Sequence, residues 1–218
     1  MSASVTFKLN GAGRGDGGDA FPAADSHRRR PVADAAIGLW VFMGVAGALF
    51  SLFIAAYVMR MDGSDWSPIA PPQQLWLSTA LLVAGSVLMQ AAGVQARAMW
   101  LRRARLLLLL GGACALAFLA AQLWAWQALH AMQVSLAGNP AGSFFYLLTA
   151  MHGLHVLGGL AGWSVAAHRA WRAGPAQAAL GITLCARYWH FLLAVWIVLF
   201  AAIGWLTPAV VRFICGTA

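Results

Sequence analysis

The stretch AIGLWVFMGVAGALFSLFIAAYVM, residues 36–59, runs for 24 residues without a charged side chain. At a rise of about 1.5 Å per residue, a helix over this stretch is longer than the roughly 30 Å hydrocarbon core of a bilayer. Its length and composition therefore predict a transmembrane helix.

Four further apolar stretches of similar length follow, at about 75–96, 104–129, 144–168 and 187–208. The chain as a whole is 61% hydrophobic and 9% charged, whereas about a quarter of the residues of a soluble domain are charged. The sequence thus predicts an all-α polytopic membrane protein with five transmembrane helices in residues 35–210. Residues 1–34 lack the apolar core of a signal peptide and are expected to be a flexible tail, and 211–218 a short C-terminal tail.

The basic residues predict the orientation of these helices. Arginines gather in the N-terminal tail and in the second and fourth connections, and the third connection has no charge. The positive-inside rule then places the N-terminus in the cytoplasm and the C-terminus outside, which explains the net charge of +8 better than nucleic-acid binding does. Seven of these side chains are expected to favour anionic lipid headgroups: Arg97, Arg102, Arg103, Arg105, Arg169, Arg172 and Arg187.

Two pairs of small residues have the spacing that lets helix backbones approach closely in lipid. These are Gly44 with Ala48 in the first span and Gly158 with Gly162 in the fourth. A sequence rich in Ala and Gly also produces such pairs by chance, so a helix contact and no contact stay equally open for each.

Several polar side chains are expected at membrane depth, where they are costly and face protein, water or lipid: Gln90, Gln122, Thr149, His152, His155 and His190. His152 and His155 are three residues apart and share a helix face. Counted from the expected span ends, His155 and His190 differ in depth by about 8 Å, which is poor geometry for one metal ion. The three cysteines follow no ligand spacing. For these histidines a structural, hydrogen-bonded role is the favoured hypothesis. A role in proton transfer ranks second, and metal or haem binding ranks third.

The acidic residues limit the chemistry further. All six are aspartates: Asp16, Asp19, Asp25, Asp34, Asp62 and Asp65. A mechanism that needs a carboxylate inside the membrane is therefore not carried by this chain alone.

Four stretches resemble, in order, segments of subunit III of the haem–copper terminal oxidases. TAMHGLHVLGG at 149–159 resembles T-G-x-H-G-x-H-V-x-x-G, and RYWHFLLAVW at 187–196 resembles Y-W-H-F-x-D-x-x-W. GLWVFMGVAGALF with AAYVMR at 55–60 resembles the first helix shared by the family, and FLAAQLWAWQAL at 118–129 resembles F-L-x-x-Q-x-x-E-W-x-x-L. The chain is similar to the five-helix form of the family, whose orientation agrees with the predicted one.

The departures from the family pattern concern its buried carboxylates. The glutamate of the first shared helix aligns with Ala46, the glutamate of the third span with Ala125, and the aspartate after Y-W-H-F with Leu193. Carboxylate chemistry linked to these positions is therefore not expected here. The matching polar side chains are expected to form a structural polar cluster: Gln122, Thr149, His152, His155, Tyr188 and His190.

The resemblance implies a non-catalytic subunit of a bacterial respiratory oxidase in the inner membrane. It implies no catalytic residue, metal or cofactor in this chain. Haem and copper are expected in the partner subunits, with subunit I as the main contact, subunit II as a further partner and phospholipid bound. The expected role is to pack on and stabilise subunit I during oxygen reduction coupled to proton pumping.

Two alternatives stay open at this point. The chain could serve a nitric oxide reductase complex, whose catalytic subunit is related. An independent transporter would need broken helices or inward charges, and no proline falls within the core of a span. Cytochrome c and quinol both stay open as the electron donor of the oxidase.

Overall fold

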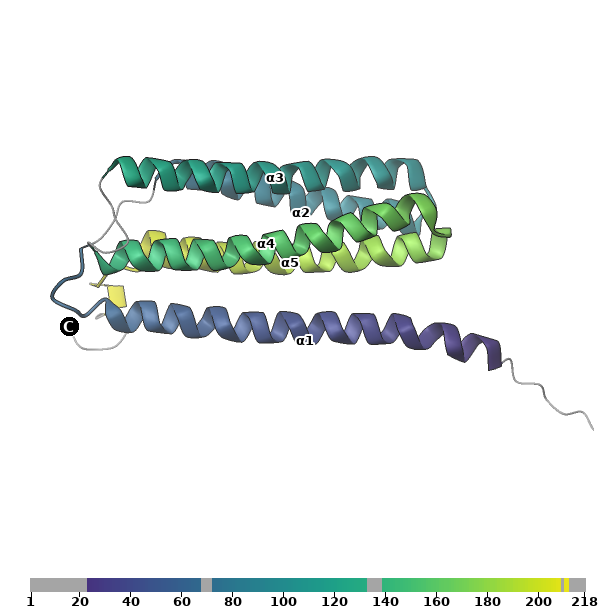
Figure 1. The fold of residues 1–218 in the computed structure, drawn as a ribbon, viewed down its shortest axis with the longest axis horizontal. Coiled ribbons are helices and arrows are strands. Elements are labelled where there is room, and N and C mark those ends of the chain that lie inside the picture. The colour runs from purple at the N-terminus through teal and green to yellow at the C-terminus, as the bar shows by residue number, and fades with distance from the viewer. Residues whose placement is uncertain (1–22, 68–71, 133–138, 209, 212–218) are drawn as a thin grey trace, which may run out of the picture. The chain divides into compact units, whose positions relative to one another are not determined.

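The computed structural model describes residues 23–67, 72–132, 139–208 and 210–211, with side chains from residue 35 onward. All the regular structure in these ranges is helical (Figure 1). The helices are α1 (Ala23–Arg60), α2 (Gln74–Arg97), α3 (Leu101–Ala131), α4 (Pro140–Arg172) and α5 (Pro175–Trp205).

Each of the five helices is long and apolar enough to cross a membrane. The predicted spans agree with α2, α3 and α4 to within about four residues, a normal spread for helix ends. The chain is thus an all-helical membrane protein, while its predicted orientation stays a prediction.

Two helix boundaries differ from the predicted ones. α5 begins at Pro175, twelve residues before the predicted start at 187. Gly174 precedes it and proline occupies its first position, where the missing N–H costs no hydrogen bond. α1 begins at Ala23, so residues 23–34 of the predicted tail are helical, while 1–22 and 212–218 lie outside the described residues.

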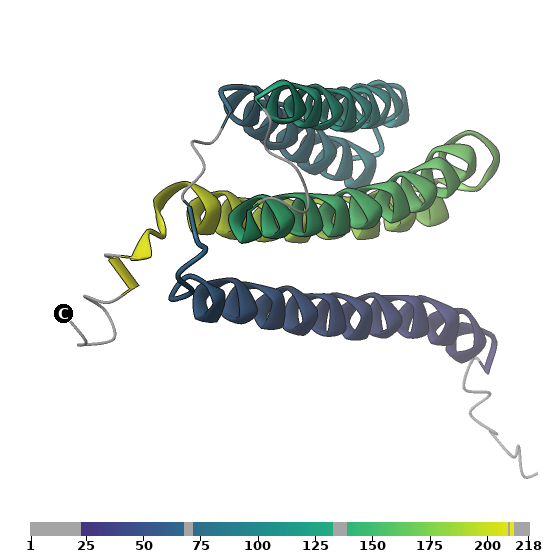
Figure 2. The ribbon, with the colours of Figure 1, turned by 60° about the vertical axis from the view of Figure 1, so that its left-hand side comes forward.

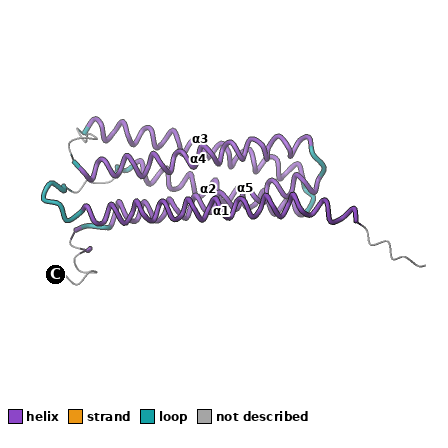
Figure 3. Tube along the Cα trace, turned by 60° about the horizontal axis from the view of Figure 1, so that its bottom comes forward, coloured by secondary structure: helices purple, strands orange, loops and turns teal. Residues whose placement is uncertain are grey.

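Helices α2–α5 lie side by side, and the two views agree on this arrangement (Figures 1 and 2). α2 contacts both α3 and α5, and α4 contacts both α5 and α3. Each helix therefore has two neighbours, and the four form a closed bundle. The tube view in Figure 3 shows the short loops between α2 and α3 and between α4 and α5, which lie at the same end.

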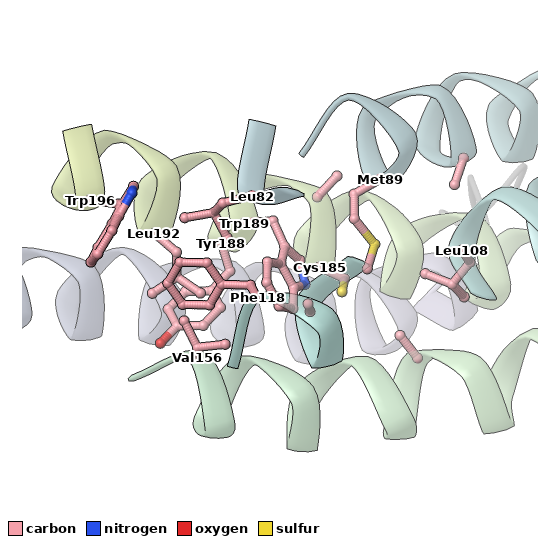
Figure 4. Close-up of a cluster of buried hydrophobic side chains, with 14 of the residues drawn as sticks. Leu82, Met89, Leu108, Phe118, Val156, Cys185, Tyr188, Trp189, Leu192 and Trp196 are labelled. Atoms are coloured by element: carbon pink, nitrogen blue, oxygen red, sulfur yellow. The ribbon is translucent and has the colours of Figure 1, made fainter. Parts of the chain in front are cut away.

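Large apolar side chains fill the centre of this bundle (Figure 4). Phe118 from α3, Met89 from α2, and Trp189 and Trp196 from α5 are all fully buried. Trp189 therefore belongs to the core. Trp40, Trp76, Trp124 and Trp205 are more than half exposed, as interfacial tryptophans are.

The part of α1 from residue 37 onward packs through side chains on α4 and α5. Phe50, Tyr57 and Met61 are buried there with Leu148 and Leu199. The loop after α1 is fixed to the start of α4 by Asn139, whose amide donates to the Ser67 carbonyl at 2.8 Å and whose oxygen accepts from the Ala141 N–H. One side chain thus caps α4 and holds the loop.

Candidate functional site

Helix α4 presents three polar side chains, Thr149, His152 and His155, that are one turn apart. His152 is fully buried, and its Nε2–H donates to the carbonyl of Leu192 on α5 at 3.1 Å. Its ring packs against Phe118 and Trp196, with ring centres 5.5 and 5.1 Å away. His152 therefore ties α4 to α5 within the aromatic core.

His155 faces α1 instead. Its Nδ1–H donates to the carbonyl of Met151 in the preceding turn of α4 at 2.8 Å. Its ring lies between Phe42 and Phe50, with ring centres 6.1 and 5.0 Å away. Ala46 is one turn from each phenylalanine and is buried. The position that aligns with the family glutamate is therefore a packed methyl group beside this histidine.

Thr149 joins α4 to α3. Its hydroxyl donates to the Phe145 carbonyl at 2.7 Å and accepts from the indole N–H of Trp126 at 3.1 Å. The hydroxyl hydrogen thus bonds within α4, and the hydroxyl oxygen bonds to α3.

Gln122 joins α3 to α2. Its amide donates to the hydroxyl of Ser78 at 3.0 Å, and that hydroxyl donates to the carbonyl of Leu75. Gln122 and Ser78 are both buried. A short relay of donors therefore ends on a backbone oxygen.

Tyr188 and His190 both lie on α5, but they bond to different helices. The Tyr188 hydroxyl donates to the His155 carbonyl of α4 at 3.0 Å. His190 faces α2, where its Nε2–H donates to Gln90 at 3.0 Å and its Nδ1 accepts from the Ser86 hydroxyl at 2.5 Å. Both ring nitrogens of His190 are therefore occupied.

The six predicted polar side chains do not form a single cluster. In the described part of the chain, no hydrogen bond joins two of these side chains. They connect different helix pairs instead. The bonds run between α2 and α3, α3 and α4, α4 and α5, and α5 and α2, so they follow the same closed ring as the helix contacts.

The predicted depth offset between His155 and His190 is also wrong. His152 bonds to Leu192, and Tyr188 bonds to the His155 carbonyl, so residues near 155 and 190 lie at similar depth. The error came from counting depth from residue 187, although α5 begins at Pro175. The two imidazoles nevertheless point to different helices, α1 and α2.

Potential metal ligands do not gather in the described residues. No group of three His, Cys, Asp or Glu side chains is close enough there to hold a metal ion. That the chain binds no metal stays a prediction.

Sequence reasoning missed several partners in these bonds. The indole of Trp196 donates to Thr79 at 2.9 Å, and the indole of Trp163 donates to the Leu108 carbonyl at 2.8 Å. On α2, the Ser78 hydroxyl accepts from Gln122, and the Ser86 hydroxyl donates to His190. The spacing of Ser78, Ser86 and Gln90 by multiples of four could have indicated one polar face of α2.

Six of the seven predicted lipid-contacting arginines lie where α2 ends, α3 begins and α4 ends, whereas Arg187 lies within α5. Arg97 donates to the Thr183 hydroxyl at 3.2 Å, and Arg105 donates to the Ala170 carbonyl at 2.8 Å. Arg103 lies over the ring of Trp100. Two of the seven side chains thus also form hydrogen bonds between helices.

The two predicted small-residue pairs lie on exposed helix surfaces. Gly44, Ala48, Gly158 and Gly162 are all exposed, and a Cβ at any of the three glycines would have no atom within 4 Å. The close contacts inside the chain involve other glycines. Gly159 faces Tyr188 and Leu192, and Gly112 lies directly under the Trp163 ring. A contact of the predicted pairs with another subunit stays a prediction.

These features define a five-helix membrane protein whose polar side chains bond neighbouring helices. The sequence model of the family Cytochrome c oxidase subunit III matches residues 36–207. A probable cytochrome c oxidase subunit 3 of Nocardia farcinica is 36% identical over 161 residues, which cover 70% of this chain and 77% of the relative. Cytochrome c oxidase subunit 3 of Thermostichus vulcanus is 28% identical, with 78% of this chain and 87% of the relative covered.

The chain therefore belongs to the cytochrome c oxidase subunit III family. The resemblance found in the four sequence stretches is confirmed over nearly the whole helical part of the chain.

Proposed function

We propose that this chain is the non-catalytic subunit III of a bacterial haem–copper oxidase and stabilises the catalytic subunit I during oxygen reduction coupled to proton pumping. The observation that carries the proposal is the closed ring of interhelical hydrogen bonds. His152 donates through Nε2 to α5, Gln122 donates through Nε2 to α2, and the Thr149 hydroxyl accepts from Trp126 of α3. Such a ring makes a rigid surface for a partner.

The lipid-exposed faces supply the second part of the proposal. Helices α1–α5 carry many exposed large apolar side chains, which suit lipid chains or the helices of subunits I and II. The arginines at one end of the bundle favour anionic headgroups, at roughly 1 kcal/mol for each side chain near the surface. Haem and copper would be held by the partner subunits.

The names of the relatives favour an oxidase over a nitric oxide reductase as the partner complex. The relatives from Thermostichus vulcanus and Bacillus subtilis are named cytochrome c oxidase subunit 3, and the relative from Nocardia farcinica is named probable cytochrome c oxidase subunit 3. Co-purification of the tagged chain from native membranes, with a haem spectrum of the captured complex, separates these two partners. Capture of a nitric oxide reductase without an oxidase would contradict the proposal.

The stabilising role is tested by purifying the oxidase with and without this chain and measuring oxygen consumption over many turnovers. We expect the same initial rate and faster inactivation without the chain. Haem and copper content serve as the control. An equal rate of inactivation would contradict the stabilising role, and loss of haem or copper would indicate a role in assembly instead.

A further inference from the structure

The outer surface of the bundle along α2 and α5 carries polar side chains in an apolar surround. On α2, the exposed Gln90 lies in a row of exposed valines that share one helix face. On α5, Arg187 and His190 are exposed one turn apart, and His190 bonds to Gln90 across the two helices. We call this surface the α2–α5 face, and it consists of Val83, Val87, Gln90, Val94, Arg187 and Ala194.

The polar part of this face lies inward from the helix ends. The other six predicted lipid-contacting arginines lie in the first or last turns of α2, α3 and α4. Arg187 instead follows Pro175, the first residue of α5, by twelve residues, which is about 18 Å along the helix. Gln90 precedes the last residue of α2 by seven residues, or about 10 Å. Lipid phosphates lie outside the hydrocarbon core, at the level of the helix ends.

Gln90 is held at this depth by its neighbours. His190 donates through Nε2 to the Gln90 side-chain oxygen at 3.0 Å, and its Nδ1 accepts from the hydroxyl of Ser86, which is buried. The amide nitrogen of Gln90 has no hydrogen-bond partner among the described residues. Because this short side chain is fixed by its oxygen, it cannot extend to the membrane surface, and an acceptor for its N–H has to lie at the same depth.

Arg187 adds a cation to the same face. Its guanidinium carries five N–H donors and forms no ion pair or hydrogen bond with the side chains that the structure describes. The sequence has no acidic residue at 35–61 and none after Asp65. A cation at membrane depth is costly without a counter-charge. The face therefore offers donors whose acceptors have to come from outside this chain.

Space for an incoming side chain lies beside Arg187. A pocket of about 530 Å³ separates this part of α5 from α1. Gly44 forms part of the α1 wall, and a Cβ there would have no atom within 4 Å. A carboxylate can therefore approach the guanidinium without displacing α1. The pocket is lined by Trp40, Met43 and Gly44 of α1 and by Arg187, His190 and Phe191 of α5.

We propose that the α2–α5 face binds a transmembrane helix of another subunit, and that an Asp or Glu of this helix accepts hydrogen bonds from Arg187 and from the Gln90 amide. A carboxylate pairs with a guanidinium through two oxygens, and a side chain on a helix can lie at the depth of Gln90, which a lipid phosphate does not reach. The valines and Ala194 pack on the apolar side chains of the same helix. The proposal rests on the proposed function in that the chain is one subunit of a complex, and it adds the surface and the chemistry of the partner.

Photo-crosslinking in native membranes tests the position of the partner helix. A photoreactive benzoylphenylalanine replaces Val87, one turn from Gln90, and the crosslinked peptide is sequenced by mass spectrometry after the oxidase has been purified. We expect a transmembrane peptide of another subunit with an Asp or Glu within about one turn of the crosslinked residue. The same probe in place of Leu123, which is 58% exposed on α3, is the control and should not link this peptide. Crosslinks to lipid alone, or to a helix without a carboxylate, would overturn the proposal.

Charge reversal then tests the ion pair in the complete oxidase. We expect Arg187→Glu to lower the amount of this chain retained per haem after a detergent wash about tenfold or more, because two like charges then meet. Replacing the crosslinked carboxylate by Arg should restore retention in that variant and lower it in the wild type. Arg172→Glu, at an exposed position in the last turn of α4, is the control and should be retained as the wild type is. Unchanged retention of Arg187→Glu, or no rescue by the reversed pair, would overturn the proposal. A chain that purifies without any oxidase subunit would instead contradict the proposed function.

Discussion

His152 shows how one side chain at membrane depth can hold two helices together. It is fully enclosed, donates to the Leu192 carbonyl of α5 and packs on Phe118 and Trp196. Hydrogen bonds between membrane helices contribute about 0.6 kcal/mol on average and up to about 1.7 kcal/mol. Packing around the ring adds to this, because loss of a large buried side chain also leaves a cavity.

We expect His152→Ala to lower the free energy of unfolding by about 2–4 kcal/mol, since it removes the bond and opens the core. His152→Gln keeps a donor of similar reach and should recover part of the loss. Unfolding of the purified chain by denaturing detergent, followed by circular dichroism, measures both. His168→Ala, at an exposed position of α4, is the control. Equal effects at the two histidines would contradict the structural role of His152.

Ala46 offers a test of the missing carboxylate. It is buried between Phe42 and Phe50, which both contact His155. Ala46→Glu should destabilise the chain alone, because the larger side chain overpacks the site and buries a charge. His155 should offset part of that loss. A double-mutant cycle with His155→Leu should show a coupling of about 0.5–3 kcal/mol, and zero coupling would contradict the proximity of the two side chains.

At the scale of elements, α3 and α4 meet where a glycine faces a tryptophan. A Cβ on Gly112 would overlap the ring of Trp163, whose indole donates to the Leu108 carbonyl of α3. The indole of Trp163 is rigid and held by this hydrogen bond. It therefore cannot make room for a Cβ at residue 112 by rotating the end of its side chain.

Gly112→Ala should therefore push Trp163 away and destabilise the chain by about 1–3 kcal/mol, the usual cost of overpacking. Gly158→Ala is the matched control on the exposed face of α4, where the higher helix propensity of alanine should be neutral or stabilising. Thermal unfolding monitored by near-UV circular dichroism of the tryptophans measures both changes. A stabilising Gly112→Ala would show that the two helices are further apart than described.

The loop after α1 contains an exposed ion pair between Arg60 and Asp65. The hydrogen bond from Arg60 lowers the pKa of the Asp65 carboxyl below its ordinary value. A lowered pKa in the folded state means that the pair contributes at pH values above the unfolded pKa. This contribution is lost as the pH falls through the lowered, folded pKa.

The carbon NMR signal of the labelled Asp65 carboxyl should thus titrate below the ordinary range for aspartate, and Arg60→Gln should bring it back up. Because both side chains are exposed, Asp65→Asn should leave the melting temperature near neutral pH unchanged. A carboxyl that titrates in the ordinary range would contradict the pairing in solution.

For the molecule as a whole, α2–α5 are joined by hydrogen bonds, whereas α1 is joined by packing. Among the described side chains of α1, none donates to or accepts from another helix. Its contacts are aliphatic and aromatic, such as Phe50 in the cluster with Leu148, and Tyr57 with Phe144. α1 therefore depends on a thin layer of side chains and on the loop held by Asn139.

Amides of residues 37–50 should accordingly exchange with deuterium faster than those of residues 145–156, because regions with few stabilising contacts open at lower free energy. Mass spectrometry of the full-length chain in detergent measures this difference. Asn139→Ala should increase exchange in the loop and the outer half of α1 while leaving α2 as it was. Equal protection of both stretches would contradict the conclusion that α1 is held less firmly than α2–α5.

Much of the fold could be predicted because hydropathy and length are properties of one helix at a time. The early start of α5 was missed because Arg187 was taken as its boundary, although a charged residue does not end a helix and Pro175 can begin one. Of the six motif residues, four are buried (Gln122, Thr149, His152 and Tyr188), whereas His155 is half-buried and His190 is exposed. Their partners Ser78, Thr79 and Ser86 were missed because partners depend on which helices adjoin and how each is rotated.

The alanines that replace the family carboxylates also bear on how this chain can change further. Ala46 is 3% exposed and Ala125 is fully buried, so neighbouring side chains now occupy the space that a glutamate would need. A reversion at either position would have to be accompanied by smaller neighbours. A single change of either alanine to glutamate is therefore expected to give a less stable protein, unless a neighbouring side chain becomes smaller at the same time.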